Sequence, residues 1–367
     1  MKKFRSYWLL LILMLMACND ASAAADGQAV AQEELNIREL ILEHLADAYE
    51  WRITSFGKTD ISIPLPVILH SRQSGWHVFM SSRLHGGQRT YNGFQIPQEG
   101  KFKGKIVETD RSGHEIRPLD LSLTKNALSL IMASTLLILL IISVARSLKR
   151  NPIKARKGFT GAMEMFIVSV NDDVIKPSIG EGYEKYAPYL LTVFFFIFIN
   201  NLLGLIPMFP GGANVTGNIA VTLVLATVTF LIVQFSGTKE YYREIFWPDV
   251  PTWLKVPIPL MPVIEIVGVF TKPFALMIRL FANILAGHAI VLGLTSLVFV
   301  TVSMGVVMNT SMTVVSVLLT VFIDLVELLV AYIQAYVFTL LSAVFIGLSR
   351  LKPHEKKLET KTDILNK

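Results

Sequence analysis

The chain has 367 residues, of which 52% are hydrophobic and 17% charged, and its formal net charge is +6. This composition is far too apolar for an ordinary soluble domain and indicates an integral membrane protein. The basic residues gather in short runs beside apolar segments rather than on one polar face, so we predict no nucleic-acid partner and interpret the charge as a topology signal.

The first 25 residues have the layout of a secretory signal. A basic start is followed by the apolar run Tyr7–Ala17 and then by small residues. We therefore predict that residues 1–25 are a signal peptide, cleaved after Ala23 or Ala25. Cys18 lies where a bacterial lipoprotein is processed, so lipidation at Cys18 is an open alternative to cleavage. Because it is the only cysteine, an internal disulfide and thiol chemistry are excluded.

Residues 26–120 are charged, contain many glycines and lack long apolar runs, so we predict a small water-facing α+β domain. Glu33–Tyr49 has apolar residues at helical spacing. Short β-prone runs such as Ile61–Leu69 and Trp76–Met80 are separated by glycine-containing turns. The histidines of this domain lack the spacing of a metal motif, so no metal site is predicted. The sequence leaves the role of the domain open.

Apolar runs long enough to cross a bilayer begin after this domain. The hydrocarbon core, about 30 Å thick, needs roughly 20 helical residues, and three runs satisfy this: Leu121–Ala145, Tyr186–Pro207 and Val215–Phe235. The densest basic cluster, Arg146–Lys157, lies between the first two runs and is assigned to the cytoplasm by the positive-inside rule. Residues 26–120 are therefore expected outside the cytoplasm.

Two further segments suit the cytoplasmic membrane surface. Ala162–Ile179 is apolar on one face but carries Asp172, Asp173 and Lys176, so we predict an interfacial helix. Tyr241–Lys255 contains two tryptophans and is predicted as a loop at the depth of the lipid headgroups.

The last two apolar segments are too long for an upright span. Met261–Val300 has about 40 residues, which as one helix would reach about 60 Å, roughly twice the hydrocarbon thickness. Met312–Leu348 poses the same problem, and the polar stretch Met304–Ser311 links the two. We predict two long, strongly tilted antiparallel helices, which complete an all-α polytopic membrane fold of about five spans over residues 121–350. Residues 351–367 would be a basic cytoplasmic tail.

Ionisable residues recur on one face of the first long helix. Glu265, Lys272 and Arg279 are seven residues apart, so each step drifts by only about 20°, and Asn283 stays near that face. A charge in lipid is costly unless it faces protein or water, so these residues are expected to line an internal path. For Glu265 and Lys272, which lie near the cytoplasmic end, reaching the headgroups is an open alternative.

Arg279 is expected too deep in the membrane for its side chain to reach the lipid headgroups. Its guanidinium stays protonated, so it cannot carry a proton by titrating, but it repels a passing cation and favours the ionised form of a nearby carboxylate. Small residues at Ala282, Ala286 and Gly287 would let another helix approach closely, although packing within this chain also explains them.

The second long helix carries Glu327 and Gln334 on one face. His288 lies about half a turn around the first helix from Arg279. Because the two helices run in opposite directions, Gln334 is expected opposite Arg279, and Glu327 is expected close to His288 towards the outer end. A glutamate and a histidine with access to water can relay protons, since both can titrate near neutral pH. A static buried ion pair is the alternative.

Several of these stretches match a known pattern. Lys272–His288, which contains Arg279 and Asn283, resembles the signature of subunit a of the rotary ATP synthase membrane sector, and Glu327–Leu341 resembles its final helix. Asn200–Pro207 and Gly212–Thr216 are also similar to the family pattern. The resemblance covers most of residues 153–348 and its motifs are highly specific.

The resemblance implies a stator that grips a rotating ring of c subunits, each with an ionisable carboxylate in mid-membrane. By position, Arg279 would make each ring carboxylate release its proton and would separate two aqueous half-channels. The other residues implied in the ion path are Asn283, His288, Glu327 and Gln334 on the outer side or beside the arginine, and Glu265 and Lys272 on the cytoplasmic side. Some family members have an acidic residue at the position of Gly204, so the outer entrance is left open here.

The sequence contains no phosphate-binding glycine loop of the form GxxxxGK[ST], so we expect no enzymatic activity and no cofactor in the chain alone. The resemblance implies c-ring subunits, peripheral-stalk b subunits and the rest of the ATP synthase as partners, in a bacterial inner membrane with residues 26–120 in the periplasm. A secondary transporter for a small solute is the alternative, although we see no internal repeat of the kind such transporters show. The sequence does not fix proton or sodium coupling, or the size of the ring.

Overall fold

The computed structural model describes eight stretches of the chain: 47–56, 59–72, 74–97, 100–109, 115–150, 158–206, 211–247 and 260–350. Within them, five helices are long and apolar enough to cross a membrane, and a small strand-containing region precedes the first of these. The predicted architecture is thus confirmed. The predicted signal peptide with Cys18, most of the predicted helix Glu33–Tyr49 and the predicted tail lie outside the described residues.

Short antiparallel strands make up the region before the first membrane helix. β1 (Glu50–Phe56) and β2 (Thr59–Pro64) form a hairpin. One three-stranded sheet has the order β4 (Gly75–Met80), β3 (Pro66–Ser71), β8 (Leu119–Asp120), and the other has the order β5 (Phe94–Gln95), β6 (Val107–Thr109), β7 (Glu115–Ile116). Two 3-10 turns, Ser81–Arg83 and His85–Gly87, follow β4. The predicted strand run Ile61–Leu69 is divided at Leu65 between β2 and β3.

Tyr49 lies in the core of this region. Its ring is buried, and its phenol donates a hydrogen bond to Asp120 and accepts one from the backbone N–H of Ile106 at 3.4 Å. Burial, and secondarily the bond to Asp120, raise the pKa of Tyr49 above its ordinary value, so the phenol keeps its proton. The prediction that the helix Glu33–Tyr49 extends through residues 47–49 is therefore wrong. Tyr49 forms a bend before β1 because its ring packs into the core.

Backbone hydrogen bonds connect this region to the first membrane helix, α3 (Lys125–Arg150). The N–H of Leu121 donates to Ile68 at 2.9 Å, which continues the pairing with β3, and the N–H of Lys125 donates to Ala48 at 2.9 Å. The predicted span Leu121–Ala145 therefore begins too early. Its first residues are apolar, but their backbone groups belong to the sheet.

The remaining membrane helices agree with the predicted segments. They are α6 (Ala187–Leu205), α7 (Ile219–Ser236), α9 (Leu260–Val300) and α10 (Val306–Arg350). The predicted interfacial segment Ala162–Ile179 is helical, as α4 (Phe159–Ser169), a π-helical turn (Val170–Ile175) and α5 (Lys176–Ile179), and a 3-10 turn (Tyr183–Lys185) leads into α6.

Two segments predicted as non-helical connections are partly helical. The predicted loop Tyr241–Lys255 contains a helix, α8 (Lys239–Phe246), because the Thr238 side chain accepts a hydrogen bond from the Tyr241 N–H at its N-terminus. The predicted link Met304–Ser311 is mostly helical. The chain instead reverses through a 3-10 turn (Thr301–Met304) and Gly305, whose positive φ of 98° suits glycine.

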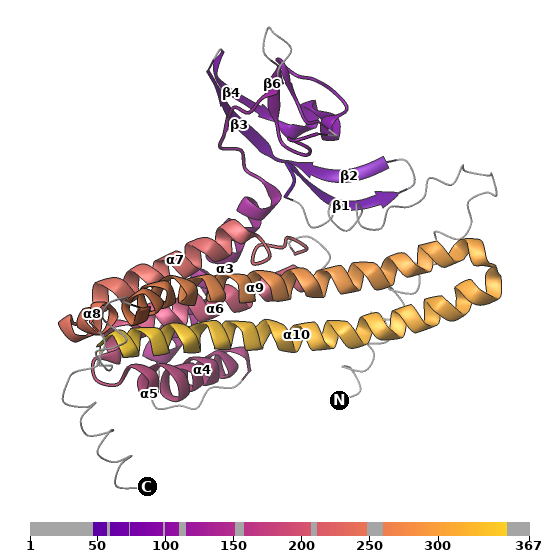
Figure 1. Cartoon of the computed structure of the whole chain (residues 1–367). Coiled ribbons are helices and arrows are strands. Elements are labelled where there is room, and N and C mark those ends of the chain that lie inside the picture. The colour runs from indigo at the N-terminus through magenta and orange to yellow at the C-terminus, as the bar shows by residue number, and fades with distance from the viewer. Residues whose placement is uncertain are drawn as a thin grey trace. The chain divides into compact units, whose positions relative to one another are not determined.

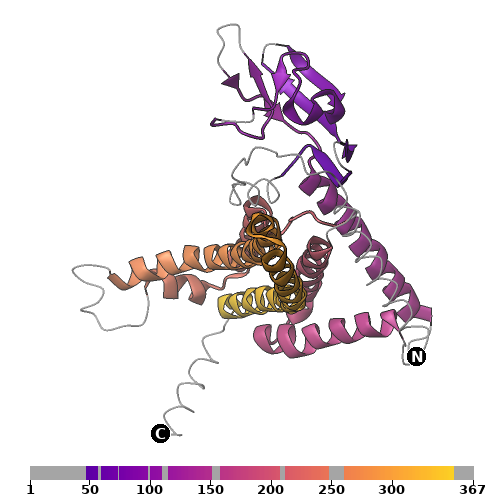
Figure 2. The same ribbon diagram turned by 90° about the vertical axis from the view of Figure 1, so that its right-hand side faces the viewer.

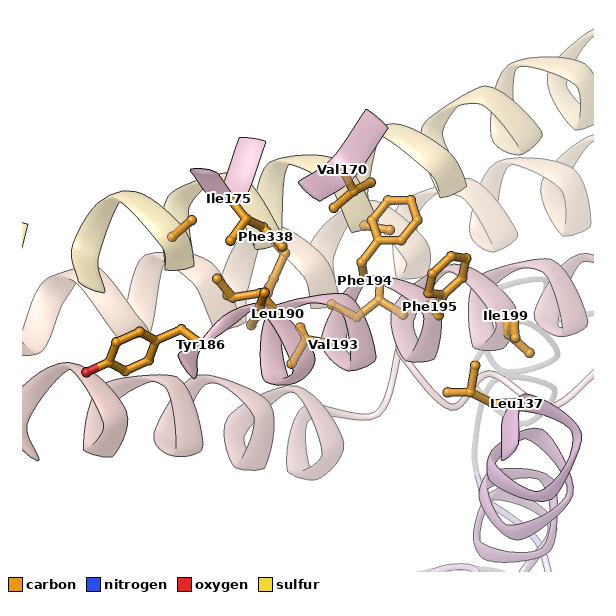
Figure 3. Packing of buried hydrophobic residues seen from close by; sticks show 14 of the residues in the cluster. Leu137, Val170, Ile175, Tyr186, Leu190, Val193, Phe194, Phe195, Ile199 and Phe338 are labelled. Carbon is orange, nitrogen blue, oxygen red and sulfur yellow. The ribbon is translucent and has the colours of Figure 1, made fainter. Parts of the chain in front are cut away.

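The hydrophobic core of the membrane region is built around α6 (Figure 3). Leu190, Phe194 and Phe195 of α6 are at most 2% exposed. They belong to one buried cluster with Phe338 of α10 and Leu137 of α3. A helix so uniformly apolar needs neighbours on several sides, and it fixes where the flanking helices lie.

α9 and α10 run side by side in opposite directions (Figure 1). Figure 2 views the pair from the end at which the turn joins them. The far end of α10 is fixed to other elements, because Arg350 donates to the backbone oxygen of Glu181 at 3.1 Å and Ser349 accepts from the Thr238 N–H at 2.9 Å. The predicted antiparallel pair is confirmed, and it positions the candidate site residues.

Candidate functional site

Arg279 lies on the exposed face of α9. Leu280 and Ile284, about 100° and 140° around the helix from Arg279, are 1% and 6% exposed and pack into the core, which turns Arg279 outward. Among the described residues, Arg279 has no hydrogen-bond or ion-pair partner. A permanent cation on the outside of a membrane helix requires water or a partner protein, because lipid would not solvate it.

Small or polar residues surround Arg279 on the same face. Ala275, Ala282, Asn283 and Ala286 are all exposed. Side chains this short let the backbone of another helix approach α9 closely. The described residues leave Ala282 and Ala286 exposed, so packing among them does not account for these two small side chains, whereas it does account for Gly287, which lies against Glu327.

Gln334 does not bond to Arg279. It is buried in α10, at 8% exposure, whereas Arg279 is exposed, and no hydrogen bond joins the two side chains in the described structure. The amide is therefore buried within the chain, whereas the guanidinium is exposed.

His288 and Glu327 are brought together from α9 and α10. The distance from His288 Nδ1 to Glu327 Oε1 is 3.6 Å, and the two side chains are 19% and 6% exposed. The expectation that the antiparallel arrangement would make them neighbours is confirmed. At 3.6 Å the pair is an ion pair when the histidine is protonated, but it is too long for a hydrogen bond. Glu327 Oε1 is buried and accepts no hydrogen bond from the described residues.

Gly287 makes room for this pair, and Gly204 lies beside it. A Cβ on Gly287 would overlap the Glu327 carboxyl group, with Cδ only 2.9 Å away. A Cβ on Gly204 of α6 would lie 3.7 Å from His288 Nε2. The sequence predicts a close helix approach at Gly287 and links Gly204 to the outer entrance, but nothing in the local sequence shows that Glu327 and His288 are the side chains beside them.

Asparagines of α6 add polar groups nearby. Asn201 donates to the backbone oxygen of Ala331, one helical turn beyond Glu327, at 3.1 Å, and Asn200 donates to Phe196 within α6 at 2.8 Å. The side-chain oxygens of both asparagines are buried without a partner among the described residues. Buried acceptors of this kind suit a path for protons or water.

At the other end of α9, Lys272 borders a pocket between α7, α8, α9 and α10. Gln234 donates to the Tyr241 phenol at 3.3 Å in this pocket, and the Lys272 ammonium lies 5.8 Å from the centre of the Phe345 ring. Burial raises the pKa of Tyr241, and the negative charge of Glu265 raises it further. Glu265 and Lys272 therefore belong to one end of the bundle, well separated along α9 from His288.

The described residues contain no group of three or more histidines, cysteines, aspartates or glutamates that would hold a metal ion. Around Arg279, His288 and Glu327 the site offers a permanent cation, an imidazole, a carboxylate and several amides. Such a set can repel cations and pass protons.

Comparison with protein families finds two matches. Residues 127–347 match the family described as ATP synthase A chain, which covers the membrane helices and all the candidate site residues. Residues 40–123 match a domain of unknown function (DUF8433), which covers the strand-containing region.

Similar proteins include three from bacteria. The chain is 46% identical over 245 residues to ATP synthase subunit a 2 of Chlorobaculum tepidum, covering 64% of this chain and 65% of that protein. It is 45% identical over 266 residues to ATP synthase subunit a of Chlorobium phaeobacteroides strain BS1, covering 70% and 72%. It is 36% identical over 301 residues to ATP synthase subunit a of Myxococcus xanthus, covering 80% and 90%.

Proposed function

Because the chain belongs to the ATP synthase A chain family, we propose that it is the ion-translocating stator subunit of a rotary ATP synthase in a bacterial inner membrane. The observation that carries this proposal is Arg279, a cation with no partner among the described residues, on an exposed, small-residue face of a membrane helix. A ring of c subunits with mid-membrane carboxylates is the partner that such a face suits, since each carboxylate would find there the opposite charge that favours its ionised form.

In this proposal Arg279 makes the ring carboxylate release its proton and prevents ions from leaking through. Its guanidinium stays charged, so it makes a passing ring carboxylate give up its proton without accepting that proton itself. The same charge repels a cation that would cross directly from one side to the other. The arginine thereby separates two half-channels, and ions must travel with the ring.

His288 and Glu327 form the proton relay of the outer half-channel. A carboxylate and an imidazole can each accept and release a proton, and their 3.6 Å separation lets one water molecule bond to both. Asn283 and Gln334 lie near the transfer point, and Glu265 and Lys272 border the cytoplasmic half-channel. The strand-containing region is outside the cytoplasm and the end of α10 is inside. ATP is made by partner subunits, and the peripheral-stalk b subunits hold the chain still.

The proposal is tested by cross-linking the arginine face to its partner. In the tagged, assembled complex, a cysteine at Ala282, one turn from Arg279, should capture the c subunit with a short thiol-reactive photo-cross-linker. Val224→Cys is the matched control, because Val224 is 60% exposed on α7, a different membrane helix. Mass spectrometry identifies the products. Capture of c at both positions or at neither contradicts the proposed interface, and purification of the chain alone with a bound solute would favour the transporter alternative.

Gly287→Ala tests the relay geometry. The added methyl group displaces the Glu327 carboxyl group, so proton-driven ATP synthesis should fall by about tenfold to a hundredfold. The measurement is the ATP synthesis rate of inverted membrane vesicles, normalised to the amount of complex. Gly293→Ala is the control on the same helix, since a Cβ there meets nothing within 4 Å. Equal losses in the two variants would show that helix flexibility matters and the Glu327 position does not.

A further inference from the structure

Trp51 is buried in a cluster that joins the strand region to the membrane helices. Its side chain, on β1, is only 2% exposed and packs with Ala213 and Val215, each 1% exposed. Leu128 of α3 and Val221 of α7 lie against the same cluster. A tryptophan of the first strand thus fills a space bounded by the turn between α6 and α7 and by the ends of two membrane helices.

The turn that Trp51 contacts is tightly held to α6. Gly212 donates its backbone N–H to Leu203 at 3.1 Å, and Val215 donates to Ala213 at 3.0 Å. The Asn214 side chain accepts a hydrogen bond from Gly217 at 2.9 Å. These bonds fix the turn locally, so a displacement of Ala213 would move the end of α6 with it.

The same turn borders His288. A Cβ placed on Gly204 would lie 3.7 Å from the carbonyl oxygen of Ala213 and 3.7 Å from His288 Nε2. Ala213 therefore contacts Trp51 on one side and flanks the space between Gly204 and His288 on the other. Trp51, Ala213, Gly204 and His288 are thus successive neighbours from the strand region to the imidazole.

We propose that Trp51 is a positioning residue for proton entry: it holds the 212–216 turn, and this turn sets the width of the outer path to His288. The inference rests on the proposed function, which places His288 in the outer half-channel. Through Trp51, the strand region acts as a fixed support for the channel entrance. A Trp→Ala change would leave a large cavity, into which the turn would relax.

Trp51→Ala should therefore impair proton supply from the outer side specifically. In inverted vesicles, where the outer side faces the lumen, the proton concentration in the lumen that gives half-maximal ATP synthesis should rise roughly threefold to tenfold. The dependence on the external pH should stay as in the wild type. Trp76→Ala is the matched control and should show no shift, because Trp76 lies in the same region but is 60% exposed.

Two further variants separate positioning from loss of folding. Trp51→Phe keeps an aromatic ring in the cluster and should restore most of the wild-type lumen dependence. Val215→Ala reduces the contact from the turn, so it should shift the lumen dependence in the same direction. Combined with Trp51→Ala it should add less than its own effect, because both changes act on one contact.

An unchanged lumen dependence in Trp51→Ala overturns the inference, even if the maximal rate falls with the amount of complex. If the Trp51→Ala complex fails to assemble, the lumen dependence of ATP synthesis in Val215→Ala and Trp51→Phe tests the inference instead. The proposed function is tested separately by Arg279. If Arg279→Ala stops synthesis while the lumen dependence of Trp51→Ala stays normal, only the positioning role is wrong.

Discussion

Arg279→Ala is expected to abolish proton-driven ATP synthesis, with a loss of about a hundredfold or more. Without the guanidinium, nothing in the described structure near this face forces a ring carboxylate to ionise. The assembled complex should persist in normal amounts, because Arg279 is exposed and has no bonded partner among the described residues. The measurements are the ATP synthesis rate of inverted vesicles and the quantity of complex in the same membranes.

The control for this change is Arg243→Ala, an exposed arginine of α8, which should leave synthesis at the wild-type rate. Arg279→Lys keeps a positive charge but loses the planar guanidinium, so it should restore little activity. Wild-type synthesis by Arg279→Ala would show that the stator proposal is wrong. If Arg279→Ala abolished the uptake of a solute and left ATP synthesis intact, the transporter alternative would be supported.

Glu327→Ala is expected to lower proton-driven synthesis by about a hundredfold, because the relay loses its carboxylate. Exchanging the two groups, with Glu327→His and His288→Glu in one chain, should cost less than Glu327→Ala, since the variant keeps one carboxylate and one imidazole at the two neighbouring positions. The comparison uses inverted vesicles and is read as a double-mutant cycle, in which the exchange variant should be better than the product of its two single changes.

Asp324→Asn distinguishes a specific relay from a general negative field. Asp324 is exposed and lies one helical turn before Glu327, so its loss should reduce synthesis far less than Glu327→Ala. Equal losses in the two variants would favour a field effect. An exchange variant no better than Glu327→Ala would indicate the static ion pair.

The sequence predicted the long elements and one contact between them. Segment length alone required two helices that exceed the bilayer, and their opposite directions then placed His288 beside Glu327, as the structure confirms. The roles of Arg279, Asn283 and Gln334 remain predictions. These inferences worked because they depend on helical periodicity and chain reversal, both of which are local or nearly local properties.

The missed features all depend on contacts between distant parts of the chain. The start of α3 was placed too early because the pairing of Leu121 with Ile68 cannot be read from hydropathy. The space beside Gly204 and Gly287 arises from neighbours on other helices. Trp51 looked like one more residue of a β-prone region, and only the packing against Ala213 showed where it points.

The length of α9 has a consequence for the sense of rotation. Its 41 residues extend about 60 Å, so a helix confined to a layer about 30 Å thick travels about 50 Å sideways between its ends. In the proposed stator, the two half-channels would then be offset around the circumference of the ring as well as across the layer. An ion admitted on one side would reach the other only after the ring had carried it along that arc, and for a given direction of ion flow the handedness of the slant would set the sense of rotation.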